Sequence, residues 1–242
     1  MRKFWLAATI FSALGAAAPV LAADLGVAPA YKGPPALYGW TGCYVGIEGG
    51  GAWGGSSVTA ASGRFAGQAI TGSFNTSGGL AGGTVGCNYQ VGSWVFGGEN
   101  DLSWINKQGS THDIPPFNVN AVNSVQEKWL DTFRGRIGYT WDRTLIYATG
   151  GLAVDRVGID VCSAVACVGD SKTVTGWTVG AGLEYAFWNN WSLKAEYLYA
   201  NFGSPQFIDT PVRLGSTNFV TRDFRLHDNI ARAGLNYRFN WP

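Results

Sequence analysis

The segment TFRGRIGYTW, residues 132–141, alternates between an apolar row and a polar row, and this alternation limits the folds open to the chain. The polar row carries two arginines, Arg134 and Arg136. A repeat of two residues is that of a β-strand, because successive side chains point to opposite faces. The segment ARAGLNYRFNW, which starts at Ala231, repeats the pattern with Arg232 and Arg238 in its polar row. The fold must therefore give these strands one face in an apolar environment and one face that accommodates arginine.

Eight segments carry this alternation over about ten residues or more, the length with which a β-strand crosses a membrane. They lie near Thr41–Gly54, Gly78–Gln90, Trp94–Trp104, Glu127–Trp141, Thr144–Ile159, Lys172–Trp188, Trp191–Phe202 and Asp228–Trp241. Short connections, which are typical of hairpin turns, alternate with connections of roughly 23, 22, 12 and 24 residues, well beyond hairpin length. We therefore expect an all-β fold, an eight-stranded antiparallel up-and-down transmembrane β-barrel with four longer extracellular loops and three short periplasmic turns.

The tryptophans separate this barrel from a soluble β-sandwich, the main alternative. Apart from Trp5, they fall near the expected ends of strands, at the short-turn rim or toward the long-loop rim. Aromatic girdles at both membrane boundaries are typical of a membrane-spanning barrel and not of a sandwich core. The expected girdle residues are Trp40, Trp53, Trp94, Trp104, Trp129, Trp141, Trp177, Trp188, Trp191 and Trp241.

The polar rows of the strands must then face the lumen. An arginine on the lipid face near the midplane would cost roughly 2–4 kcal/mol. An eight-stranded barrel is only wide enough for its own side chains, so we expect the lumen charges to pair as a hydrogen-bonded plug. This structural charge cluster is predicted to contain Glu48, Glu99, Asp101, Arg134, Arg136, Glu184, Lys194, Glu196, Arg232 and Arg238.

The first residues predict export. Met1, Arg2 and Lys3 precede an uncharged run and a small-residue cleavage site, as in a secretory signal peptide. We expect cleavage after Ala22 or Ala23, and a membrane anchor is the less favoured alternative. The expected organisation is a signal peptide over residues 1–22, a Pro-rich periplasmic tail over residues 23–39 and the barrel over residues 40–242. The predicted location is the cell outer membrane. A net charge of +1 without a basic stripe argues against a nucleic-acid partner.

Four cysteines in an exported chain indicate disulfides rather than a metal site. Cys162 and Cys167 are close enough in sequence to staple the third outside loop. Cys43 and Cys87 lie on the first and second strands, where they form either a cross-strand bond or two lipid-facing thiols.

Candidate catalytic chemistry is confined to His112 beside Asp113 and His227 beside Asp228, in or next to outside loops. Neighbouring residues on an extended chain point opposite ways, and no nucleophile elbow accompanies them. We therefore predict no enzyme activity, no catalytic residue, no metal site and no cofactor.

Three segments resemble the small opacity-like, outer-membrane immunogenic barrels of Gram-negative bacteria, also called porin-family proteins. They are WTGCYVGIEGGGAWG from Trp40, RGRIGYTWDRTLIYATGGLAV from Arg134 and RAGLNYRF from Arg232. The resemblance implies an eight-stranded barrel with a role in envelope integrity and surface exposure, and in some relatives haem or receptor binding. Many such relatives lack the cysteines found here.

The expected function is therefore that of a structural, surface-exposed barrel with a charge-plugged lumen. A narrow pore for small solutes, an outer-leaflet enzyme, and haem or host-ligand binding by the loops are the alternatives. Expected partners are membrane lipids and lipopolysaccharide, the barrel-assembly machinery during biogenesis, and a host or environmental surface ligand.

Overall fold

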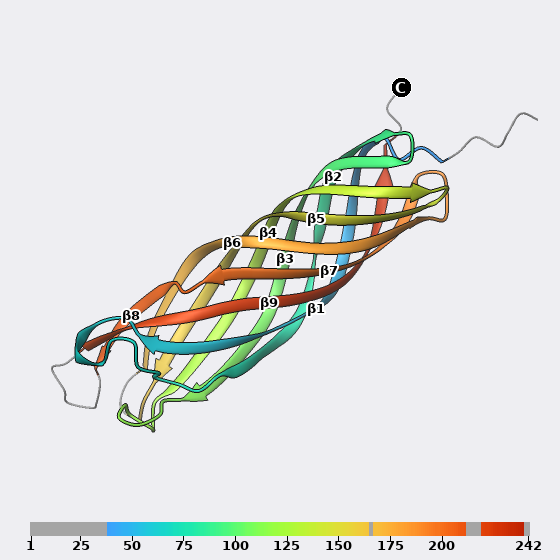
Figure 1. The fold of residues 1–242 in the computed structure, drawn as a ribbon. Helices are drawn as coiled ribbons and strands as arrows, with labels where there is room; N and C mark the ends of the chain where they lie inside the picture. The colour runs from blue at the N-terminus through green and yellow to red at the C-terminus, as the bar shows by residue number, and fades with distance from the viewer. Residues whose placement is uncertain (1–37, 165–166, 212–218, 240–242) are drawn as a thin grey trace, which may run out of the picture. The chain divides into compact units, whose positions relative to one another are not determined.

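The computed structural model describes residues 38–164, 167–211 and 219–239; the predicted signal peptide and nearly all of the Pro-rich tail lie outside these ranges. The strands are β1 (Gly42–Ala60), β2 (Phe74–Val91), β3 (Trp94–His112), β4 (Val122–Trp141), β5 (Thr144–Cys162), β6 (Cys167–Ala186), β7 (Trp191–Gly203), β8 (Gln206–Pro211) and β9 (Phe219–Arg238). A short 3-10 helix, Gly63–Phe65, lies between β1 and β2. Figure 1 follows them in chain order.

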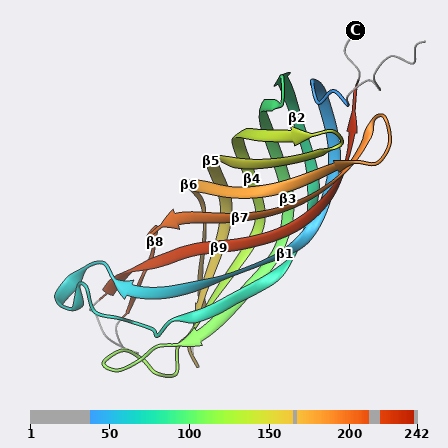
Figure 2. The same cartoon turned by 45° about the vertical axis from the view of Figure 1, so that its right-hand side comes forward.

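The strands form one antiparallel sheet that closes on itself. Each strand from β1 to β7 pairs with the next, and β9 pairs with both β7 and β1. The blue first strand accordingly lies beside the red last strand in both views (Figures 1 and 2). β8 pairs with β9 just beyond the point where β7 ends, so β7 and β8 together form one wall element. The predicted eight-stranded antiparallel barrel is confirmed.

The strands are longer than expected. Most contain 18 to 20 residues, whereas about 9–11 suffice to cross a bilayer. The predicted turns between β2 and β3, β4 and β5, and β6 and β7 are present and define the turn end of the barrel. At the opposite, loop end, residues expected to be loop continue the strands. Among the described residues, the connections there are shortened to residues 61–73 and 113–121, and β5 continues to Cys162 while β6 begins at Cys167.

The added length differs chemically from the rest, because the polarity of the outward-facing and inward-facing side chains changes along the strands. Toward the turn end the outward side chains are apolar, and Ile47 and Leu152 are 68% and 63% exposed. Toward the loop end the outward side chains are polar, as with Arg156 and Asp160 on β5. Many of the inward side chains there are apolar instead, as with Val157. The turn-end half suits contact with lipid, and the loop-end half suits contact with water.

Most of the predicted girdle tryptophans lie on the outside of the barrel near the ends of the apolar band. The exposed ones are Trp53, Trp94, Trp104, Trp141, Trp177, Trp188 and Trp191, and Trp129 is half-buried. Trp241 lies outside the described residues. Trp40 is different, since it is only 2% exposed and packs inside the turn end with Val95 and Leu145. Its assignment to the girdle is wrong, because the chain enters β1 from within the rim and not from the lipid side.

Helices do not provide a membrane crossing in the described part of the chain, where none is both long and apolar enough.

Candidate functional site

The interior of the turn-end half is filled by charged side chains. We call them the lumen cluster, and they project from β1, β3, β4, β6, β7 and β9. Its members are Glu48, Glu99, Asp101, Arg134, Arg136, Glu184, Lys194, Glu196 and Arg232, all of them buried. Five carboxylates face four cations, which leaves one net negative charge before any proton is added.

Arg134 lies at the centre of the lumen cluster. Its Nη2 donates to Glu99 Oε1 at 2.5 Å and to Asp101 Oδ2 at 2.6 Å, and its Nη1 donates to Glu196 Oε1 at 2.8 Å. The side chain is 0% exposed. One guanidinium thus ties together carboxylates from two different walls of the barrel, β3 and β7, which is a task suited to the fixed fork of arginine.

Arg136 and Arg232 extend the network toward the two ends of the cluster. Arg136 Nη2 donates to Glu184 Oε2 at 2.7 Å, and its guanidinium lies 4.0 Å from the ring centre of Tyr147. Arg232 Nη1 donates to Glu48 Oε1 at 2.5 Å, and its Nη2 donates to Glu196 Oε2 at 2.6 Å. Arg136 thus joins β4 to β6. Arg232 joins β9 to its neighbours β1 and β7, and its Nη2 also lies 3.0 Å from Asp101 Oδ2 on β3, across the lumen, so the cluster is a cross-brace as well as a filling.

Lys194 supplies the fourth cation. Its Nζ lies 3.1 Å from Glu99 Oε1 and 3.5 Å from Glu48 Oε2. Small residues on the facing strands make room for these long side chains. A Cβ added to Gly50 would lie 2.9 Å from Arg232 Cβ, for example. The alternation of glycine with charge along the strands is therefore a packing requirement of the lumen.

Arg238, the tenth residue predicted for the cluster, does not join it. It lies at the turn-end rim, half-buried, and its guanidinium donates to the backbone oxygens of Gly39 and Asn189. Alternation alone places Arg238 on the inner face, but the strand ends at this residue and the side chain turns toward the rim instead.

The turn end is closed by an apolar layer around Trp40. Val95, Leu145, Tyr147 and Ala186 surround its ring, and Trp40 Nε1 donates to the Asp142 backbone oxygen at 3.4 Å. This layer lies between the lumen cluster and the rim, so it forms a second barrier along the axis.

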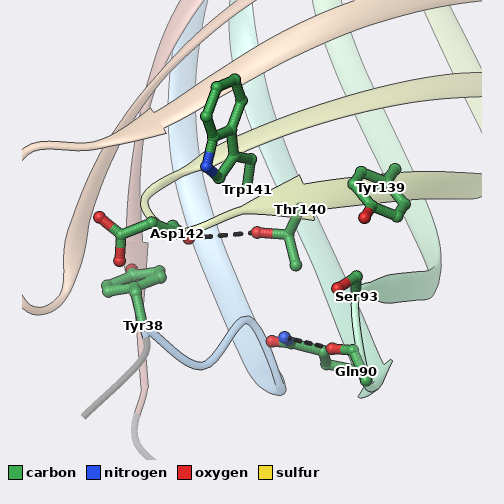
Figure 3. Close-up of a pocket in the computed structure, with 8 residues that line it drawn as sticks. Tyr38, Gln90, Ser93, Tyr139, Thr140, Trp141 and Asp142 are labelled. Carbon is green, nitrogen blue, oxygen red and sulfur yellow. Dashed lines mark hydrogen bonds between the residues drawn. The ribbon is translucent and has the colours of Figure 1, made fainter. Parts of the chain in front are cut away.

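A hollow of about 420 Å³ opens on the rim beside this layer. Figure 3 shows Tyr38 and Asp142 on one side of it and Gln90 and Ser93 on the other. Partial burial raises the pKa of the Tyr38 hydroxyl, although the neighbouring Arg238 guanidinium acts in the opposite direction. The lining offers a neutral phenol and amide groups, and no nucleophile paired with a base is present among the lining residues.

A second group of buried charges lies nearer the loop end and was missed from the sequence. Lys107 donates to Glu127 Oε1 and to Asp228 Oδ1, and Asp155 lies beside them. Lys107 continues the alternation of β3 beyond Trp104, whereas Glu127 faces inward only because the parity of β4 changes between Glu127 and Leu130. Because the expected strand over Trp94–Trp104 ends before Lys107, the sequence does not predict this pairing.

A third buried group caps the interior at the loop end. Both guanidinium nitrogens of Arg222 donate to the Asp113 carboxylate, each at 2.9 Å, and Asn123 contacts both partners. Apolar side chains, including Val125, Val157 and Leu226, fill the space between the charged groups. The interior is thus stacked in alternating charged and apolar layers from one end to the other.

The two histidine–aspartate neighbours do not form acid/base pairs. Asp228 points inward to Lys107, whereas His227 is on the outer side of β9 with its ring 6.3 Å from Tyr199. Asp113 is buried against Arg222, whereas His112 is exposed. In both places the carboxylate and the imidazole lie on opposite faces of the strand or its extension, as expected for adjacent extended residues.

All four cysteines are paired. Cys43 bonds to Cys87, directly opposite it on β2, and Cys162 bonds to Cys167 at the β5–β6 connection. The predicted loop staple is confirmed, and of the two readings for Cys43 and Cys87 the cross-strand bond is the one found. Both disulfides join positions that the backbone ladder already holds side by side.

Comparisons with known proteins agree with this architecture. A family model described as an outer membrane protein beta-barrel domain matches residues 8–239. The 31 kDa outer-membrane immunogenic protein of Brucella melitensis biotype 1 is 35% identical over 216 residues, which cover 85% of this chain and 86% of that protein.

Solved structures resemble the fold at low sequence identity. The outer membrane protein OprG from Pseudomonas aeruginosa matches with a TM-score of 0.51 at 15% identity, covering 85% of this chain and 100% of that one. The outer membrane protease OmpT from Escherichia coli matches with a TM-score of 0.52 at 9% identity, covering 82% of this chain and 97% of that one. At these identities the likeness concerns the barrel alone.

Proposed function

Because this chain belongs to the outer-membrane protein β-barrel family and resides in the outer membrane, we propose that it is a structural, surface-exposed barrel whose lumen is closed by buried charge. On this proposal it supports envelope integrity through its wall. It meets ligands or other cells through its loop end and carries no solute.

The single observation that carries the closed lumen is the Arg134 hub. Its guanidinium holds three carboxylates from opposite walls within 2.8 Å. Opening a path through the lumen would separate these groups or leave them uncompensated, and breaking a buried ion pair costs about 3–5 kcal/mol. Because separating these buried ion pairs is so unfavourable, the cluster is better suited to close the lumen permanently than to open and close as a gate.

The loop end supports a surface role over a catalytic one. Its outward side chains are polar, so the wall beyond the apolar band is compatible with water. The relatives named above as immunogenic proteins are consistent with exposure to the surroundings. His227 and Asp228 lie on opposite faces of β9, which favours a non-enzymatic barrel.

Planar-bilayer recording of the refolded mature chain tests the closed lumen. We expect no steady channel from the wild-type protein, with a general porin in the same bilayer as the positive control. Heat-modifiable migration on gels establishes that the sample is folded. Steady channels would favour the alternative, a narrow pore for small solutes.

The variant Trp40→Ala separates the two barriers. It removes the apolar layer at the turn end but leaves the lumen cluster intact, so we expect it to remain silent. If Trp40→Ala conducts steadily while the wild type does not, the apolar layer and not the charge cluster closes the lumen. That result would contradict the proposal.

A further inference from the structure

Three carboxylates meet inside the loop-end half, away from the lumen cluster. Glu127 of β4, Asp155 of β5 and Asp228 of β9 each offer one oxygen, and these oxygens all lie within 4.8 Å of one another. All three residues are buried, and Asp155 is 0% exposed. We call them the carboxylate triad.

One cation already lies in the triad, and it reaches only two of its members. Lys107 Nζ donates to Glu127 Oε1 and to Asp228 Oδ1. Among the described residues, Glu127 Oε2, Asp228 Oδ2 and both carboxylate oxygens of Asp155 lack a hydrogen-bond partner. Asp228 faces Asp155 as a like charge and Lys107 as an opposite charge, and the Glu127 side chain and the Arg156 backbone amide lie beside it as the nearest groups that can share a hydrogen with it. Asp155 is therefore a buried carboxyl group that faces two other carboxyl groups.

The charge balance of this layer favours an additional positive charge. When all three carboxyl groups are ionised, the one ammonium leaves two negative charges in a region that also holds Val125, Val157 and Leu226. Burying uncompensated charge among apolar side chains is expensive. Four uncommitted oxygens offer the ligands that a hard divalent cation prefers.

We propose that the carboxylate triad binds a divalent cation, with Ca²⁺ as the best fit, through the oxygens that Lys107 leaves uncommitted. One oxygen from each of the three carboxyl groups lies within 4.8 Å of the other two, which is close enough for all three to reach one ion. Ca²⁺ holds its ligands at about 2.3–2.6 Å, whereas Mg²⁺ requires about 2.0–2.1 Å. The ion neutralises the two excess charges and joins β4, β5 and β9 above the level of the lumen cluster.

Because the triad is enclosed by apolar side chains, the ion must be present while the barrel folds. The mature chain is refolded in detergent with Ca²⁺, with Mg²⁺ or with a chelator, and is then separated from unbound ion by gel filtration. We expect about one Ca²⁺ retained per chain by elemental analysis. We also expect a higher midpoint for heat-induced unfolding after refolding in Ca²⁺ than after refolding with chelator.

The variant Asp155→Asn is expected to lose the bound Ca²⁺ and the Ca²⁺-dependent midpoint shift. Asp160→Asn is the matched control, since Asp160 is on the same strand but is exposed. It should retain both properties. If Asp155→Asn does not fold, Glu127→Gln provides the same test.

Two results would overturn the site. One is a wild-type chain that retains neither ion and melts at the same midpoint in all three conditions, in which case protons neutralise the triad. The other is an Asp155→Asn variant that still binds Ca²⁺ as the wild type does.

Discussion

Trp104 of β3 lies directly opposite Trp129 of β4, and the register between the two strands shifts immediately above this pair. Toward the turn end from this pair, most outward side chains are apolar and the inward ones include the charged lumen cluster; Asn100 and Asp131 are outward exceptions that hydrogen-bond to each other. Above it, Asn106 and Gln126 face outward and Val125 faces inward. The two tryptophans therefore mark the level at which the surroundings of the wall change from lipid to water.

The first prediction concerns this level. A cysteine placed by Asp160→Cys, on the polar outer face of β5, should react with a membrane-impermeant maleimide on intact cells. A cysteine placed by Leu152→Cys, on the apolar outer face of the same strand, should not react until the membrane is dissolved. Equal labelling of both variants on intact cells would contradict the assigned lipid boundary.

The second prediction concerns the Arg134 hub. Arg134→Met should destabilise the refolded barrel by roughly 3–5 kcal/mol, because Glu99, Asp101 and Glu196 lose a shared partner while they remain buried. Denaturant unfolding in detergent, followed by the shift in gel migration, measures the change.

Arg156→Met is the control for this substitution, since Arg156 is exposed and its guanidinium contacts the Ser171 hydroxyl at the surface. We expect a change of less than about 1 kcal/mol there. Equal effects of the two substitutions would show that the hub contributes no more than a surface side chain.

The third prediction compares two adjacent glycines. A Cβ at Gly50 would lie 2.1 Å from the Ala231 backbone oxygen, whereas the nearest atom to a Cβ at Gly51 is the Gly78 oxygen at 3.8 Å. Gly50→Ala should lower the yield of heat-modifiable, folded protein, and Gly51→Ala should leave it unchanged. A normal yield from Gly50→Ala would mean that β1 and β9 separate more easily than their packing indicates.

The fourth prediction concerns the disulfides. Protein denatured without reductant should show no thiol that reacts with maleimide, because Cys43–Cys87 and Cys162–Cys167 account for all four cysteines. Mass spectrometry of a non-reduced digest should recover both cross-linked pairs. A free Cys43 in correctly inserted protein would instead indicate the lipid-facing thiols considered from the sequence.

Most of the wall could be predicted from the sequence because the period of two residues is a direct consequence of strand geometry. The same alternation assigned nine of the ten lumen residues to the inner face, where the structure places them. The short turns followed from connection length alone. Arg238 departs because an arginine at the end of a strand can reach the rim, which alternation does not describe.

The loop-end half could not be predicted in this way, because the rule that apolar side chains face outward and polar side chains face inward no longer holds there. A strand that leaves the membrane keeps its alternation, but its outward side chains become polar and many of its inward side chains become apolar. In β4 the parity also changes, since Glu127 and Leu130 are both buried across an irregular step in the register. Glu127, Asp155 and Asp228 all lie within expected strands. Lys107 lies beyond the expected end of its strand, and Glu127 faces inward only because of the irregular step, so the meeting of these side chains inside the barrel was not predicted.

The extension of the strands past Trp104 and Trp129 has a consequence for recognition from outside the cell. The surface that an antibody or a phage contacts there consists largely of paired β-strands, which we call the strand surface. Side chains such as Arg156 and Asp160 are held on it at fixed spacing. Epitopes on the strand surface combine residues from neighbouring strands. Short linear peptides copied from the chain would therefore reproduce them poorly.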